Sequence, residues 1–199
     1  MYPPADYLEQ DKEKIFRVIE TCSFATLISR TEDDIIVTHL PLILDRQRGD
    51  FGFLVGHMDR NNPHTRWIDD EKVFVIFHGP NAYISPKVYK TPQLPTWNSI
   101  AVHIKGIARR TESKEAVRDS LTRMAAFLET GADPFVLDKE HQKMQQLLGY
   151  VVGFEVEILS MIGRFKLSQN KNARDKQLAK EQLMSHSKMG HDQLIDFVI

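Results

Sequence analysis

The segment from Gly56 to Pro63 holds the residues of this sequence that are best suited to bind an anion. An apolar run ends at Gly56, and a short helix is expected to begin near Asn61 or Asn62. Free backbone N–H groups at a helix start favour an anion. Arg60 is the only lysine or arginine of the segment, and its guanidinium can hold a phosphate through paired hydrogen bonds. Two readings stay open here, because Arg60 can equally be a solvated surface residue and Asn61 an ordinary N-cap.

Other short stretches place polar and aromatic side chains near expected strand ends. Trp97 suits either the protein core or the wall of a ligand site. His39 and His57 are more readily structural histidines than metal ligands, because neither lies in a metal-binding spacing. The stretches are Thr38-His39-Leu40-Pro41, Val55 to Pro63, Phe77 to Pro80, Ala82 to Pro86, and Pro95-Thr96-Trp97-Asn98.

Several common catalytic motifs are missing from the sequence. It has no G-x-G-x-x-G fingerprint, no phosphate loop of the Walker type, no H-E-x-x-H pair and no G-x-S-x-G elbow. We therefore predict no catalytic residue and no metal site of the chain's own. Enzyme chemistry, if there is any, would come from a bound cofactor.

Charge and cysteine content narrow the choice of partner and compartment. The net charge is −1, with 26 Lys+Arg against 27 Asp+Glu, which lacks the basic excess typical of nucleic-acid-binding proteins. The single cysteine, Cys22, cannot form an internal disulfide and agrees with a reducing, cytoplasmic compartment. The best local basic patch is more readily a solvated helix face than a binding surface, and it consists of Lys166, Lys171, Arg174, Lys176 and Lys180.

The length and the N-terminus predict one domain that does not enter a membrane. The chain has 199 residues, which fits one domain over 1–199 with a C-terminal helix and tail from about 172. Its start lacks the basic and apolar regions of a signal peptide, and no apolar run reaches about 18 residues.

Hydrophobic periodicity predicts an α+β protein built on an antiparallel sheet or barrel. Gly79-Pro80 is expected to end the fourth strand. Gly149 is expected to end the helix over 138–148. A proline-rich segment from Pro86 to Pro95 forms a long loop, and long ordered loops are often functional. The expected strands are 24–29, 35–44, 51–58, 72–77, 97–109 and 150–159, and the residues 161–167 are compatible with a continuation of the last one. The expected helices are 11–22, 59–68, 111–130, 138–148 and 172–187, followed by an apolar tail over 194–199.

Taken together and in this order, the short stretches resemble the PaiB family, also called FMN-binding negative transcriptional regulators. The resemblance runs from Met1-Tyr2-Pro3 to Leu167-Ser168-Gln169-Asn170, nearly the whole chain. It implies a split antiparallel β-barrel of the FMN-binding type with flanking helices, like that of pyridoxamine-phosphate oxidases and flavin reductases. Such proteins are homodimers that bind flavin at the subunit interface.

The resemblance also implies which residues hold FMN. Arg60, Asn61 and Asn62 match a phosphate-binding segment that usually carries two cations, so we expect either weaker phosphate binding or assistance from His57 or a residue from elsewhere. Thr38, His39, Leu40 and Pro41 match a strand edge that borders the flavin ring. Trp97 and Asn98 match positions that could cover the ring or hydrogen-bond to it.

The function implied by the resemblance is negative regulation of sporulation and of degradative-enzyme (protease) synthesis. DNA would be bound directly, or regulation would act indirectly through a metabolite or partner, since no helix-turn-helix is evident. The alternative is a flavin-dependent oxidoreductase or a haem-handling split-barrel protein. A role for Leu167 to Asn170 stays open at this point.

Overall fold

A computed structural model describes residues 3–111 and 113–187 of the chain. Most of the expected strands and helices are present, and two strands are much longer than the sequence suggests. The strands are β1 (Leu8–Glu9), β2 (Phe24–Arg30), β3 (Ile35–Pro41), β4 (Ile43–Asp45), β5 (Phe53–Asp59), β6 (Glu71–Ile84), β7 (Thr96–Arg110) and β8 (Val151–Lys166). The helices are α1 (Lys12–Thr21), α2 (Lys114–Leu128), α3 (Gln142–Tyr150) and α4 (Ala173–His186), with 3₁₀ turns η1 (Ala5–Tyr7), η2 (Pro63–Trp67) and η3 (Pro86–Val88). The expected helix over 59–68 is wrong, because β5 continues to Asp59 and only a 3₁₀ turn follows it, and the expected strand over 35–44 is divided into β3 and β4.

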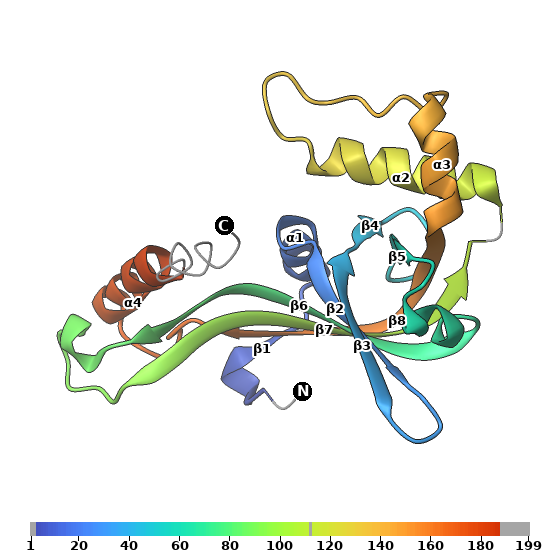
Figure 1. The fold of residues 1–199 in the computed structure, drawn as a ribbon. Coiled ribbons are helices and arrows are strands. Elements are labelled where there is room, and N and C mark those ends of the chain that lie inside the picture. Colours follow the sequence, from blue (N-terminus) through green and yellow to red (C-terminus); the bar gives the residue numbers. More distant parts are fainter. Residues whose placement is uncertain (1–2, 112, 188–199) are drawn as a thin grey trace.

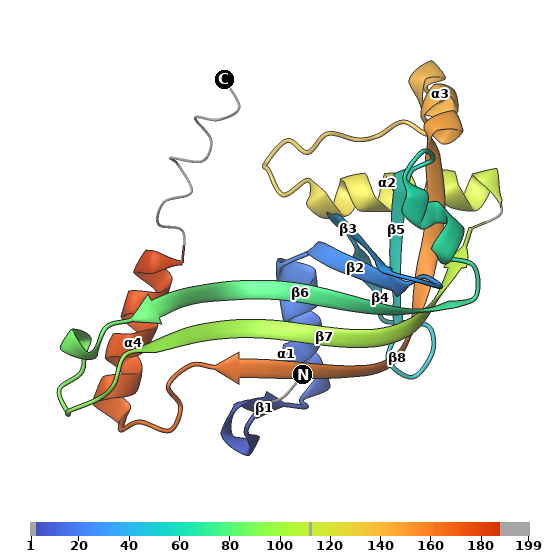
Figure 2. The ribbon, with the colours of Figure 1, turned by 60° about the horizontal axis from the view of Figure 1, so that its bottom comes forward.

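One antiparallel sheet with the order β3-β2-β6-β7-β8-β5-β4 forms the centre of the molecule, and β1 pairs with β8. The sheet curls so that β3 contacts β5, although the two strands lie far apart in the sheet order. The long strands β6, β7 and β8 run side by side beyond the curled part, toward α4 (Figures 1 and 2). This curled half-barrel with flanking helices confirms the predicted split antiparallel β-barrel.

Helix α1 closes the inner face of the sheet. Asp11 caps its start by accepting hydrogen bonds from the backbone N–H groups of Glu13 and Lys14. Ile15, Phe16 and Ile19 of this helix are buried in one cluster with inward-facing side chains of the strands. The strand residues in this cluster include Leu27, Val75, Phe77, Val102, Ile104 and Val156.

The opposite face of the sheet, here called the outer face, is not covered over β2, β3 and β6 by any helix of the described residues. Side chains alternate along each strand, so the neighbours of the buried residues point outward. Phe24 and Ile35 are 66% and 62% exposed, and Val37 is also exposed. We define the outer face by Phe24, Thr26 and Ile28 of β2, Ile35, Val37 and His39 of β3, and Phe74 and Ile76 of β6, which the strand register places side by side.

Strand β6 continues through Gly79-Pro80, so the expectation that this pair ends the strand is wrong. β2 pairs with β6 only as far as Phe77, so the following residues need a partner only on the β7 side. A register shift between His78 and Asn81 accommodates Pro80, which has no N–H to give. A Cβ on Gly79 would lie 3.0 Å from Cβ of Ile100, so glycine permits this close packing.

Gly149 lies inside α3 rather than after it, so the expectation that it stops the helix is also wrong. The helix runs through Tyr150 and passes directly into β8 at Val151. Its final carbonyl groups are bound by Arg60, as described below, which replaces the usual glycine cap.

None of the helices in the described part of the chain is long and apolar enough to cross a membrane. The apolar segment 194–199 lies outside the described residues.

Candidate functional site

The connection between β5 and η2, where the anion site was expected, is anchored to the barrel by polar side chains. Asn62 caps η2 by accepting a 3.0 Å hydrogen bond from the backbone N–H of His64. Its amide Nδ2 also donates to Oγ1 of Thr38 at 3.1 Å. Two of the predicted site residues, Thr38 and Asn62, are therefore in direct contact.

Below this contact lies a buried histidine that the sequence reading missed. The ring nitrogens of His64 lie 2.9 Å from Oγ1 of Thr38 and 2.8 Å from Oγ of Ser29. Its side chain is fully buried, and this burial lowers its pKa to about 4, so the ring is neutral at pH 7. A neutral imidazole can donate through one nitrogen and accept through the other, which suits two hydroxyl partners.

Arg60 holds the end of α3. Its Nε donates to the carbonyl oxygen of Gly149 at 2.8 Å, and one terminal nitrogen, Nη2, donates to that of Val151 at 3.0 Å. Its backbone N–H also donates to the carbonyl oxygen of Tyr150 at 2.8 Å. The other terminal nitrogen, Nη1, has no hydrogen-bond partner among the described residues. Neighbouring Asn61 is exposed, and its backbone N–H donates to Oδ1 of Asp59 at 2.7 Å.

Arg60 also lines a pocket of about 270 Å³ that carries two further cations, Arg110 and Lys114. Arg110 ends β7, and its Nη2 donates to the carbonyl oxygen of Thr65. Its Nε lies 4.0 Å from the carboxylate of Asp69, and Lys114 forms no ion pair within the described part of the chain. The three positive charges suit an anion, because one distant carboxylate leaves most of the charge uncompensated.

Arg110 and Lys114 belong to the residues that sequence reasoning missed. They are 50 and 54 positions beyond Arg60 in the chain, and only the pairing of β5 with β8 and of β8 with β7 brings them together. A resemblance that expects two cations in the phosphate-binding segment was the one available signal. It left open weaker binding, help from His57 or help from a residue elsewhere, and it did not name Arg110 or Lys114.

The stretch Thr38 to Pro41 is divided between the two faces of the sheet. Thr38 points inward to His64, and Leu40 is buried in the core. His39 lies on the outer face, with its Nδ1 3.0 Å from Oγ1 of Thr26 and its ring stacked on Phe24 at 6.4 Å between centroids. Pro41 is half-buried opposite Phe24.

His57 is separated from the polar contacts around Asn62. Val55 of the same strand packs against Met124 of α2, and alternation places His57 on this α2 side of β5. Nδ1 of His57 is buried and has no hydrogen-bond partner in the described residues. Burial lowers the pKa of this imidazole, so it is a neutral side chain at pH 7.

Trp97 and Asn98 lie at the far end of β7. Trp97 is 55% exposed opposite Tyr83, and its Nε1 donates to Oδ1 of Asn81 at 3.3 Å. Asn98 is buried and donates from Nδ2 to Oγ of Ser168 at 3.0 Å. Along a strand of about 3.3 Å per residue, Trp97 lies about 40 Å from Arg110, so one chain does not bring the two ends together.

The curled antiparallel sheet and its flanking helices define a split β-barrel of the FMN-binding type. Residues 1–160 match the family model described as "Putative FMN-binding domain", and the chain belongs to this family. It is a PaiB-like protein: it is 33% identical over 201 residues to "Protease synthase and sporulation protein PAI 2" of Bacillus subtilis strain 168. That alignment covers 100% of this chain and 96% of the relative.

Solved structures share the fold at low sequence identity. The FAD and heme binding protein from Mycobacterium smegmatis aligns with a TM-score of 0.62 at 13% identity, covering 87% of this chain and 80% of that chain. The flavocytochrome Anf3 from Azotobacter vinelandii aligns with a TM-score of 0.60 at 12% identity, covering 80% and 69%. At this identity the comparison establishes the architecture alone.

Proposed function

We propose that the protein is an FMN-binding transcriptional regulator of the PaiB type, which represses sporulation and protease synthesis as a cytoplasmic homodimer. Membership of the FMN-binding family and the name of the Bacillus subtilis relative support this proposal. The observation that carries the cofactor part is the cation-lined pocket of Arg60, Arg110 and Lys114 at the end of β5.

In this proposal the FMN phosphate occupies that pocket. The free Nη1 of Arg60 and the amine of Lys114 supply hydrogen-bond donors to the phosphate, and Arg110 adds positive charge. Lys114 and Arg110 are thus the additional cations that the segment Arg60-Asn61-Asn62 does not contain. Bound FMN would contribute its redox-active ring. His39 and Pro41 border that ring on the outer face of β3, whereas Thr38 and Leu40 point inward and support the strand from behind.

A second copy of the chain completes the proposed site. Trp97 and Asn98 lie about 40 Å along β7 from the phosphate pocket, beyond the reach of one flavin in the same chain. The exposed apolar side chains of the outer face favour pairing with another protein surface. Pairing of two outer faces would bring Trp97 of one copy toward the flavin of the other.

The experiment that tests this site is a titration with FMN and with riboflavin, which lacks the phosphate. Arg60→Ala is expected to weaken FMN binding about ten- to a hundredfold, since hydrogen bonds to charged groups contribute roughly 1.5–3 kcal/mol. Riboflavin should lose far less. An equal loss of affinity for FMN and riboflavin would mean that Arg60 contacts the flavin ring or only stabilises the fold. No loss of affinity for either ligand would mean that the phosphate binds elsewhere.

A flavin-dependent oxidoreductase is the second candidate. A hollow of about 720 Å³ beside the exposed Trp97 and Tyr83 offers room for a substrate, and His78 and Cys22 also line it. Burial raises the pKa of the Cys22 thiol, so this cysteine is an unreactive thiol rather than a thiolate nucleophile. Catalytic oxidation of NADH or NADPH by the FMN-loaded protein would favour this candidate, and no turnover would favour the regulator.

A further inference from the structure

A second positively charged pocket lies at the opposite end of the long strands. Its volume is about 420 Å³. The end of β8 and the segment after it supply Lys166, Ser168, Asn170 and Lys171 to its wall. On β8, Lys166 lies twelve residues beyond Phe154, which pairs with Arg110 of the first pocket. At about 3.3 Å per residue, this separates the two pockets by about 40 Å within one chain.

The positive charge of this pocket is not balanced by carboxylates. Lys166 and Lys171 line it, neighbouring Arg164 bonds to Oγ of Ser99 at 2.9 Å, and none of the three forms an ion pair among the described residues. All three side chains are half-buried. Burial, together with the charges of Arg164 and Lys171, lowers the pKa of the Lys166 ammonium, so a bound anion would relieve this repulsion.

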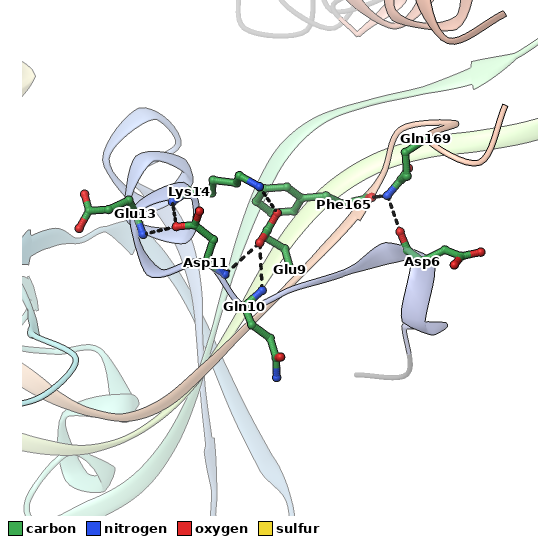
Figure 3. A network of polar contacts seen from close by, with 8 residues as sticks. All are labelled: Asp6, Glu9, Gln10, Asp11, Glu13, Lys14, Phe165 and Gln169. Atoms are coloured by element: carbon green, nitrogen blue, oxygen red, sulfur yellow. Dashed lines mark hydrogen bonds and ion pairs between the residues drawn. The ribbon is translucent and has the colours of Figure 1, made fainter. Parts of the chain in front are cut away.

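The wall of the pocket is held in place before any ligand binds. Ser168, with a left-handed φ of 61°, is buried and hydrogen-bonded to Tyr89 and Asn98. Gln169 donates to the carbonyl oxygens of Phe165 and Asp6, which ties the N-terminal segment to the end of β8 (Figure 3). Such a wall is preorganised, which lowers the entropic cost of binding.

The other side of the pocket is apolar. Tyr7 lies in the N-terminal segment that Gln169 holds, and its ring centroid lies 5.9 Å from Nζ of Lys166. Pro92, Leu94 and Pro95 of the proline-rich loop form most of the remaining wall, together with Gln93 and Thr96. Leu94 is 83% exposed, so its side chain is free to contact a bound molecule.

We propose that this pocket binds a small molecule in which a phosphate or carboxylate group is joined to an apolar body, separately from the flavin. Lys166 and Lys171 hold the anionic group, and Tyr7 and Leu94 contact the apolar body. This assigns a role to the segment Leu167 to Asn170, which holds both walls in position. In a regulator, such a pocket gives a metabolite a place to act.

The test is calorimetric titration of the full-length protein with phenyl phosphate, benzoate and inorganic phosphate at low ionic strength. Phenyl phosphate or benzoate should bind, and the tighter of the two identifies the preferred anion. Lys166→Gln and Lys171→Gln should each weaken binding about tenfold. The matched control Lys87→Gln, at an exposed lysine of η3 outside the pocket, should not change it.

A second variant separates the two walls of the pocket. Leu94→Ser should weaken the binding of phenyl phosphate and leave that of inorganic phosphate unchanged, because only phenyl phosphate has an apolar body. Absence of binding by both organic anions, or an equal loss in Lys87→Gln, would overturn the proposal. Loss of phenyl phosphate binding in the presence of saturating FMN would also overturn it, because the pocket would then belong to the flavin site.

Discussion

The guanidinium of Arg60 donates from Nε to the carbonyl oxygen of Gly149 at 2.8 Å, across 89 positions of the chain. This contact joins the connection after β5 to the end of α3, and Nη2 extends it to Val151. The side chain therefore has a structural role whatever ligand it binds. Stability and ligand affinity must be measured separately for any variant at this position.

Arg60→Ala is expected to lower the free energy of unfolding by about 1 kcal/mol. The carbonyl groups of Gly149 and Val151 lose a charged donor, but the contact to Gly149 is exposed and that to Val151 only partly buried, which puts the loss below that of a fully buried pair. Urea denaturation measures this difference. The unfolding free energy of Arg60→Lys should lie between those of the unaltered protein and Arg60→Ala, because an ammonium cannot reproduce the geometry of two guanidinium hydrogen bonds. Unchanged stability in Arg60→Ala would contradict the structural role.

Lys114→Gln gives a cleaner test of the phosphate pocket than Arg60. Lys114 begins α2 and forms no ion pair in the described structure, so its removal should leave stability nearly unchanged. FMN binding should weaken about tenfold, or about 1.4 kcal/mol, while riboflavin binding stays the same. Flavin fluorescence quenching measures both affinities, with Lys87→Gln as the control. Equal FMN affinity in Lys114→Gln and the unaltered protein would remove Lys114 from the site.

Stability should fall as the pH is lowered from about 6.5 to about 4. The pKa of His64 is about 4 in the folded protein and near 6.5 when unfolded, so the unfolded chain binds the additional proton in this range. The folded state is thus favoured above pH 6.5 and progressively loses up to about 3 kcal/mol on acidification. Urea denaturation at several pH values measures the slope.

His64→Gln serves as the comparison for this pH dependence. A glutamine can still bond to Thr38 or Ser29 and does not titrate, so its unfolding free energy should change less between pH 6.5 and 4. His39→Gln, at an exposed histidine, is the control and should keep the slope of the unaltered protein. Parallel slopes in all three proteins would exclude His64 as the cause.

Light scattering at micromolar concentration should give the mass of a dimer. The apolar side chains of the outer face, including Phe24 and Val37, are expected to lie between the two copies. Val37→Lys should shift the mass toward the monomer, because a charge would be buried in this interface. Lys87→Gln should stay dimeric. A monomer mass for the unaltered protein would contradict the proposed two-copy flavin site.

The alternation of side chains, as in Phe154, Val156 and Ile158 facing inward between Glu155 and Glu157, predicted an antiparallel sheet or barrel. The split-barrel type was predicted by the resemblance to the PaiB family. The sequence could not predict that β6 passes through Pro80, because this depends on where β2 stops pairing. For the same reason it singled out Arg60 but could not indicate that Arg110 and Lys114 line the same pocket. Local spacing indicates which residues lie near one another in the chain, whereas strand order brings distant cations together.

Direct DNA binding by the purified protein should be weak and steeply dependent on salt. The chain has almost no net charge, and its best basic surface is small: Arg174, Lys176 and Lys180 are exposed on α4. Each neutralised phosphate contributes about −0.9 to the slope of log K against log salt, so three contacts predict a slope near −3. Fluorescence anisotropy across a salt series measures it, and replacing all three residues by glutamine should flatten the slope. Tight, sequence-selective binding at physiological salt would contradict this expectation and favour direct repression over an indirect route.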